Sequence, residues 1–331
     1  MRIINSIKVR FSTLKSRIID LIYYSQTYKN DYIEMQRINK LFSYQFNKNK
    51  FIHYDIVLKY LYIQAYFDDV PFERDKIYTL YSKMQIRRNN QNTKFFISKF
   101  NNLIESIRLN KYDLSSLIDV DSKNHLLGGN HRIACALYFE LAIIPVRFYR
   151  WKYTKYFDIN WFYKHDFTAA ECKYLEVKRK EIAIKHGIYF QIILWPPIKE
   201  YFNDIENSIS LKCNVLESFT LSVDKNDFRC FLADVYEIDD IDKWKVDKKY
   251  IGMKDFKTSM RIINIEIPNP TFRRKANNSD ICEEVENIKA LYRKKYSAKI
   301  KNYFHDIIIH IGDNFEHTKA MKEVILKYEK S

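Results

Sequence analysis

One stretch near the middle of the chain changes its hydrophobic period twice, and this change constrains the fold more than any other feature. Leu117–Val120 has the pattern of a short strand, and His125–Leu127 begins a second strand after a polar turn. Residues 131–139 have helical spacing, and Ile143–Tyr149 again has the pattern of a strand, in which Pro145 favours an edge position. The succession of strand, turn, helix and strand predicts an α+β region.

Two adjacent glycines connect the second of these strands to the helix. Gly128 and Gly129 are two of only five glycines among 331 residues. Glycine lets the backbone approach a ligand closely, and the N-terminus of a helix attracts anions. Asn130 stands at the expected N-cap, His131 can donate from either ring nitrogen, and Arg132 offers a fork for phosphate oxygens. The pattern predicts an anion site; the alternative is a tight turn with a packed histidine and a surface arginine.

The stretch IDVDSKNHLLGGNHRIACALYFELAIIPVRFY resembles the central motif of the ParB/sulfiredoxin-like fold. The resemblance covers roughly residues 95–149 and includes a preceding helix at Phe95–Leu109, the glycine turn, a helix with small residues and a strand of the IPV type. In that family the turn holds the phosphates of a nucleotide. The resemblance therefore implies phosphate binding by five residues here: Gly128, Gly129, Asn130, His131 and Arg132.

The family includes partition proteins that bind and hydrolyse CTP, nucleases, an ATP-using sulfinic acid reductase and a free-serine kinase. Asn130 stands where the reductase has its catalytic cysteine, so sulfinic reduction is not expected. No compact helix pair follows Tyr149, which argues against DNA partition. What the resemblance then implies is phosphoryl transfer, or nucleotide binding without turnover, with ATP or CTP and Mg²⁺.

Phosphoryl transfer needs a carboxylate that takes the proton of the acceptor. Asp119 and Asp121 lie on or just after the strand before the glycine turn, and are the nearest acidic candidates for catalysis. Both also fit the alternative of turn residues that cap a hairpin.

A second group of polar residues lies in HDIIIHIGDNFEHT, which spans residues 305–318 and contains three of the eight histidines. An apolar strand ends at Gly312 and a helix begins near Asn314, so the polar groups meet at the end of a strand. His310 and Asp313 are candidate catalytic residues, and His317 is a candidate substrate ligand. The three also suit a metal site; the alternative is an N-cap at Asp313 beside ordinary surface histidines.

The segment PNPTFRRK ends in three consecutive cations, Arg273, Arg274 and Lys275. They are candidates for binding a phosphorylated or acidic substrate, and a solvated basic loop is the alternative reading.

The pattern along the whole chain predicts an α+β protein in four segments. Residues 1–94 form a helical N-terminal extension, 95–150 a ParB/sulfiredoxin-like core, 151–185 a connecting segment, and 186–331 a second α/β domain. The expected strands of that domain are Tyr189–Trp195, Phe219–Val223, Arg261–Ile267 and Asp306–Ile311; the expected helices are 280–299, with a capping box of Asp280 and Glu283, and 314–327.

The composition limits which partners and which cell compartment are expected for the protein. The net charge is +15, which attracts polyanions or anionic lipid without specifying either. Five widely spaced cysteines without a CxxC pair argue against a disulfide framework and a structural zinc site, and fit a reducing cytoplasm. Residues 1–19 carry five basic and no acidic side chains, and their apolar side chains recur at helical spacing. They predict either a helix on the anionic inner face of the membrane or a helix packed on the protein body.

These observations favour a nucleotide-dependent phosphotransferase that acts on a small molecule or glycan precursor. The composition and the basic N-terminus would suit bacterial surface-polysaccharide biosynthesis. The first alternative is a nucleic-acid-binding ParB-like protein or nuclease, which would use the positive charge. The second is a pseudoenzyme that holds a nucleotide as a structural ligand.

Overall fold

The computed structural model describes residues 32–48, 50–68, 71–89, 93–150, 155–274, 279–301, 303–304 and 307–329. Unit 1 contains Met1–Leu41 and Leu58–Tyr156, and unit 2 contains Phe42–Val57 and Phe157–Ser331. The chain therefore passes between the units three times. These units differ from the four predicted segments, because residues of the expected N-terminal extension enter both units. The predicted helix at residues 1–19 lies outside the described residues.

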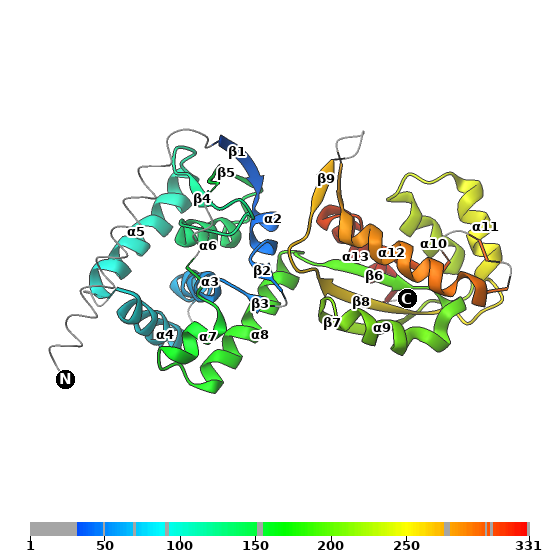
Figure 1. Ribbon diagram of the computed structural model, residues 1–331, viewed down its shortest axis with the longest axis horizontal. Coiled ribbons are helices and arrows are strands. Elements are labelled where there is room, and N and C mark those ends of the chain that lie inside the picture. Colours follow the sequence, from blue (N-terminus) through cyan, green and yellow to red (C-terminus); the bar gives the residue numbers. More distant parts are fainter. Residues whose placement is uncertain are drawn as a thin grey trace. The chain divides into compact units, whose positions relative to one another are not determined.

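Unit 1 is built around a small mixed sheet (Figure 1). The strand order is β1-β5-β4, with β1 antiparallel and β4 parallel to β5. A helix connects the two parallel strands, as parallel pairing requires. The elements of this part of the chain are β1 (Tyr32–Arg37), α2 (Ile38–Ser43), α3 (Tyr54–Phe67), α4 (Pro71–Asn89), α5 (Thr93–Asn110), β4 (Ile118–Val120), α6 (Asn130–Tyr138) and β5 (Ile143–Phe148).

Helix α5 confirms the helix expected over Phe95–Leu109, and it buries Phe100, Ile104 and Ile107 along one face. The succession of β4, α6 and β5 also agrees with the expected strand, helix and strand. The expected second strand does not form, because Leu126 makes only an isolated bridge to Val120.

Two expectations for unit 1 were wrong. Strand β1 lies in the region predicted to be helical, and it pairs with β5 from Tyr32 opposite Phe148 to Arg37 opposite Ile143. This makes β5 the central strand, whereas Pro145 had indicated an edge. Pro145 is tolerated because β4 pairs with β5 only from Val146 onward, so β1 alone lies beside the proline.

Unit 2 contains a four-stranded antiparallel sheet in the order β11-β6-β8-β7. Along the chain, α9 connects β6 to β7, α10 and α11 lie between β7 and β8, and α12 lies between β8 and β11. Its elements are β6 (Phe190–Leu194), η1 (Pro196–Tyr201), α9 (Phe202–Ser210), β7 (Asn214–Ser222), α10 (Phe228–Glu237), α11 (Lys243–Met253), β8 (Ser259–Glu266), β9 (Phe272–Arg274), β10 (Asp280–Cys282), α12 (Glu283–Tyr296), η2 (Ser297–Lys299), β11 (Ile309–Ile311) and α13 (Phe315–Glu329).

The remaining elements of unit 2 are the hairpin of β2 (Phe46–Asn47) and β3 (Lys50–Phe51) and the helices α7 (Ile159–Lys164) and α8 (Ala169–Lys185). Helix α8 begins with a capping box, in which Thr168 accepts from the Glu171 amide and Glu171 accepts in return. The buried face of α8 includes Arg179, which forms an ion pair with Glu266 at the end of β8.

The predicted strands and helices of this domain are present with shifted ends. Every residue of β6 is buried, which explains why its residues other than Gln191 are apolar, and the strand ends before Pro196 as expected. The predicted capping box at Asp280 is wrong. Asp280 lies in β10, and α12 begins at Glu283 after Cys282, which makes no side-chain cap.

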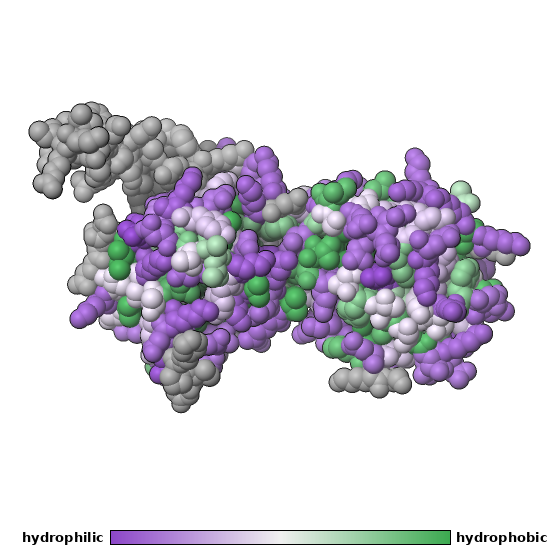
Figure 2. Space-filling view, turned by 90° about the horizontal axis from the view of Figure 1, so that it is seen from below, coloured by the Kyte–Doolittle hydropathy of each residue, from purple (hydrophilic) through white to green (hydrophobic). Residues whose placement is uncertain are grey.

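The surface of the described residues is mainly polar. On the face shown in Figure 2, hydrophilic side chains cover most of each unit, and hydrophobic residues lie among them in small groups. No helix in the described part of the chain combines the length and apolar character needed to cross a bilayer.

Candidate functional sites

The glycine turn, residues 128–132, is explained largely by local packing. Gly129 has φ of +88°, and a Cβ there would lie 2.5 Å from Ile118 Cδ1. Only glycine meets both conditions without strain. The amides of Leu127 and Gly128 both donate to the carbonyl oxygen of Asp119, at 2.8 and 3.3 Å. The expected N-cap is displaced by one residue, because Gly129 is the cap and Asn130 begins α6.

The side chains of the turn contact the protein itself. Nε2 of His131 lies 3.0 Å from the Tyr81 hydroxyl, and its ring packs on Phe100 with centroids 4.5 Å apart. Arg132 donates from Nη1 to the Leu117 carbonyl at 2.7 Å. Asn130 is buried, with 9% of its surface exposed. This geometry matches the alternative of a packed histidine, but the arginine is tied to the backbone and is not a loose surface side chain.

The two aspartates near the turn have structural partners. Asp119 forms an ion pair with Arg147 of β5 at 2.8 Å. Asp121 is 2% exposed and accepts from the backbone amides of Lys123 and His125, at 2.8 and 2.9 Å. Burial raises the pKa of Asp121, but hydrogen bonds from His125 and Lys123 outweigh it and hold the pKa below its ordinary value. A carboxylate held ionised in this way is a weak base, so Asp121 fits the hairpin-turn role.

The HIGDN turn, residues 310–314, connects β11 to α13, and its glycine lets the backbone pack closely against Thr318. A Cβ on Gly312 would lie 2.6 Å from Thr318 Oγ1. Asn314 accepts from the His317 amide at 2.8 Å and so caps α13, in the role that the sequence had suggested for Asp313. Asp313 is instead paired with Lys289 of α12. This ion pair connects the turn to α12.

His310 and His317 meet a carboxylate that the sequence did not reveal. Asp239, in the loop after α10, lies 3.8 Å from His310 Nε2 through one oxygen and 3.5 Å from His317 Nδ1 through the other. His310 is 3% exposed, and its Nε2 has no hydrogen-bond partner among the described residues. The ring of Tyr236 lies 5.1 Å from the ring of His310. A buried ring nitrogen without a partner needs an explanation, and a ligand or reacting group is one.

Cations surround His310. Burial lowers the pKa of His310 well below its ordinary value, and the charges of His317, Lys289, Lys249 and Arg293 lower it further. The ring is therefore neutral at physiological pH. Lys249 is 1% exposed, with its ammonium 4.4 Å above the ring of Tyr236. We call the following residues the His310 cluster: Tyr236, Asp239, Lys249, Lys289, Arg293, His310 and His317.

The His310 cluster could also hold a metal ion by geometry alone. One ligand atom from each of Asp239, His310 and His317 lies within 4.8 Å of the others. Two imidazoles and a carboxylate suit a transition metal. The positive charge of Lys249, Lys289 and Arg293 opposes a further cation and favours an anion.

The lysines of this cluster had a sequence signal that was missed. Lys249 lies on the buried face of α11 with Val246 and Met253, and Lys289 lies on that of α12 with Val285 and Tyr292. A lysine on an apolar helical stripe is rarely buried without a partner, so such positions mark candidate sites.

The basic hairpin is less informative. Arg273 and Arg274 lie in β9 and are exposed, and Arg273 is 3.9 Å from Glu283. Lys275 lies outside the described residues. The hairpin pairs β9 with β10, so this part of the segment is a strand where a loop had been expected.

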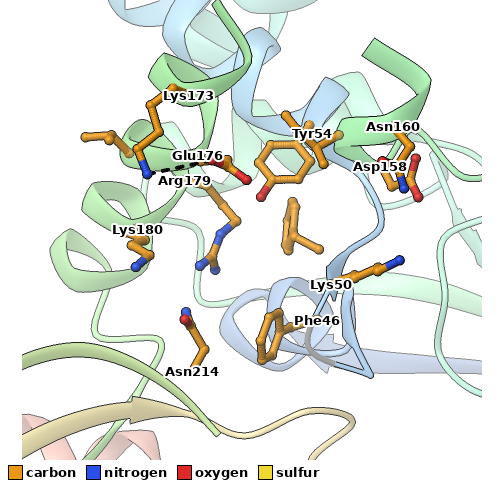
Figure 3. Close-up of a pocket in the computed structure, with 13 residues that line it drawn as sticks. Phe46, Lys50, Tyr54, Asp158, Asn160, Lys173, Glu176, Arg179, Lys180 and Asn214 are labelled. Atoms are coloured by element: carbon orange, nitrogen blue, oxygen red, sulfur yellow. Dashed lines mark ion pairs between the residues drawn. The ribbon is translucent and has the colours of Figure 1, made fainter. Parts of the chain in front are cut away.

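A pocket of about 460 Å³ lies elsewhere in unit 2 (Figure 3). Its lining shares no residue with the His310 cluster and comes from the β2–β3 hairpin and the nearby helices: Phe46, Lys50, Phe51, Tyr54, Asp158, Ile159, Asn160, Lys173, Glu176, Val177, Arg179, Lys180 and Asn214. Sequence reasoning did not identify it, because its walls come from segments more than a hundred residues apart.

Comparison of this chain with models of protein families, with curated proteins and with solved structures gave no match.

Proposed function

We propose that this protein is a nucleotide-dependent phosphotransferase for a small molecule or glycan precursor, with His310 as the residue that carries the phosphoryl group. The observation that supports the proposal most strongly is the buried Nε2 of His310, which has no described hydrogen-bond partner and lies among several cations, with Asp239 3.8 Å away. A neutral imidazole nitrogen is a nucleophile, and nearby cations stabilise the charge of a transferring phosphoryl group.

The reaction uses two steps. In the first, the lone pair of His310 Nε2 attacks the terminal phosphorus of ATP or CTP, and the bond to the bridging oxygen breaks, so that the nucleoside diphosphate leaves with the electron pair. In the second, the acceptor hydroxyl attacks the phosphorus, and the nitrogen recovers its lone pair. Asp239 is the carboxylate nearest to Nε2 and is placed to take the hydroxyl proton.

Asp313 and Lys289 have supporting roles in this proposal. The Asp313 carboxylate fixes the ammonium of Lys289, which in turn contributes positive charge at His310. Asp239 is only partly buried, with 21% of its side chain exposed, so its loop is the side from which substrates approach. Mg²⁺ would accompany the nucleotide, as in most phosphoryl transfers.

The glycine turn remains a second proposed nucleotide contact. Its support is the helix N-terminus at Asn130, where the α6 dipole favours an anion, together with the charge of Arg132. Its other features are accounted for by packing. The nucleic-acid alternative depends on the net charge of +15, and the described residues add no observation in its favour.

The test is to incubate the full chain with ATP or CTP labelled in the terminal phosphate, with Mg²⁺, and to measure protein-bound label. We expect label that is stable in alkali and lost in acid, and that is absent in His310→Asn. His186→Asn, at the end of α8, is the matched control and should label normally.

Absence of label with both nucleotides, or equal labelling of His310→Asn, would contradict the proposal. A thermal-shift measurement with Arg132→Ala runs in parallel. If Arg132→Ala loses the nucleotide-induced shift in melting temperature while the wild type is still labelled, the glycine turn also binds nucleotide.

A further inference from the structure

The pocket around Arg179 combines a fixed floor with two lysines that form no ion pair within the described part of the chain. We propose that it binds a monosaccharide that carries one anionic group, such as a phosphate or a carboxylate. The site is separate from the His310 cluster and does not depend on the proposed phosphotransferase activity.

The floor of the pocket is held rigidly by a buried ion pair. Arg179 is 3% exposed and is paired with Glu266, and the other oxygen of Glu266 accepts from the Asn214 side-chain amide at 2.6 Å. The guanidinium also lies 5.5 Å from the ring of Phe46 and 5.4 Å from that of Phe51. A buried charge with several partners has little freedom to move, so these groups present a preformed surface.

Arg179 keeps donor capacity toward the cavity. A guanidinium has five N–H donors, and its side-chain partners here are Glu266 and the Tyr54 hydroxyl. Figure 3 shows its guanidinium in the middle of the pocket, with the side chains of Tyr54 and Asn214 directed toward it.

The rim of the pocket supplies net positive charge. Lys50 and Lys180 form no ion pair with any residue that the structure describes, whereas Lys173 is 3.9 Å from Glu176. Two ammonium groups without described counter-ions attract an anionic group. A compact anion bound beside Arg179 would be within reach of one of these ammonium groups.

The rest of the lining indicates a sugar and not a bare anion. Asp158, Asn160 and Glu176 add acceptors and an amide to the lining, and hydroxyl groups can donate to the first and last of these. The aromatic side chains provide flat apolar surface beside these polar groups, a combination that suits a ring with alternating C–H and O–H bonds. A volume of about 460 Å³ accommodates one such ring with its anionic substituent.

The experiment is isothermal titration of the full chain with five probes: glucose 1-phosphate, glucuronate, glucose, inorganic phosphate and AMP. We expect saturable binding of glucose 1-phosphate or glucuronate, at least tenfold tighter than that of glucose or phosphate. The two anionic sugars decide which anionic group is preferred. Equal affinity for phosphate alone, no binding of either anionic sugar, or tighter binding of AMP that is weakened by removing Lys50 and Lys180 would each overturn the proposal.

The site is located with variants that remove rim charge without disturbing the floor. Lys180→Met combined with Lys50→Met should weaken sugar binding at least tenfold. Lys178→Met is the matched control, because Lys178 lies on the same helix, is paired with Glu181 at 2.7 Å and does not line the pocket. If the control weakens binding as much as the double variant, the proposal is wrong. Labelling of His310 in the double variant should equal that of the wild type, so failure here is distinguishable from failure of the phosphotransferase proposal.

Discussion

The glycine turn of unit 1 and the His310 cluster of unit 2 use similar residue types but satisfy them differently. In the glycine turn, His131 meets a tyrosine hydroxyl and Arg132 meets a backbone carbonyl. In the His310 cluster, His310 keeps a buried nitrogen without a described partner among several cations. The turn has the more recognisable sequence, yet its polar groups are already used in holding the fold. A motif shows which polar groups are present in the sequence. The hydrogen-bond partners of those groups in the structure show which of them can still bind a ligand.

The largest expected effect concerns the ion pair that supports the His310 cluster. Lys289→Met leaves the Asp313 carboxylate buried without its cation, and should lower the free energy of unfolding by about 3–5 kcal/mol. Chemical denaturation measures this loss. Lys245→Met, which removes an exposed pair with Asp242, is the control and should cost under about 0.5 kcal/mol. Equal costs for the two variants would show that the cluster is no more rigid than the surface.

A smaller effect tests whether the glycine turn is a structural feature. Gly129→Ala combines a left-handed backbone with a Cβ at 2.5 Å from Ile118 Cδ1, and should destabilise the protein by about 2–4 kcal/mol. At Gly128 the nearest atom to a new Cβ is Asp119 Oδ2 at 3.9 Å, so Gly128→Ala should cost less than about 1 kcal/mol. Thermal unfolding without any ligand provides the measurement. If the order of the two variants is reversed, packing does not explain the paired glycines.

The smallest expected effect is a pH dependence in unit 1. The pKa of Asp121 in the folded protein lies below its ordinary value of 3.8, so the unfolded chain binds its proton first as the pH falls. The stability that Asp121 contributes is complete above pH 3.8 and is lost as the pH falls through the folded pKa. Comparing Asp121→Asn with the wild type between pH 6 and 3 should give a difference in stability that shrinks toward low pH. A constant difference would mean that the carboxylate charge is not what matters.

The sequence predicted local features well where one face of an element is buried. The apolar stripe of Phe100 and Ile104 gave α5, and the mostly apolar run before Pro196 gave β6, which is buried on both faces. Strand β1 was missed because its outward residues Tyr32 and Ile33 remain exposed, so no buried alternation marks it. The sheet order of unit 2 depends on pairings between distant segments, which periodicity does not record.

The candidate site was predicted in part for the same reason. His310 and His317 lie seven residues apart on a strand and the helix that follows, so local reasoning brought them together. Asp239 comes from a loop some seventy residues earlier, and nothing in its neighbourhood distinguishes it from Asp240 or Asp242. Asp313 lies within the motif but is paired with Lys289, and only the packing of α12 beside β11 shows this.

The chain passes between its two units three times, and this affects how the protein can be divided into fragments for expression. Phe46, Phe51 and Tyr54 lie far upstream of Phe157, yet they line the Arg179 pocket and belong to unit 2. A fragment starting at residue 157 would lack the rings of Phe46 and Phe51, which pack against the Arg179 guanidinium. Separate expression of the C-terminal half therefore requires grafting residues 42–57 back onto it, and a simple truncation would be expected to aggregate whatever its catalytic competence.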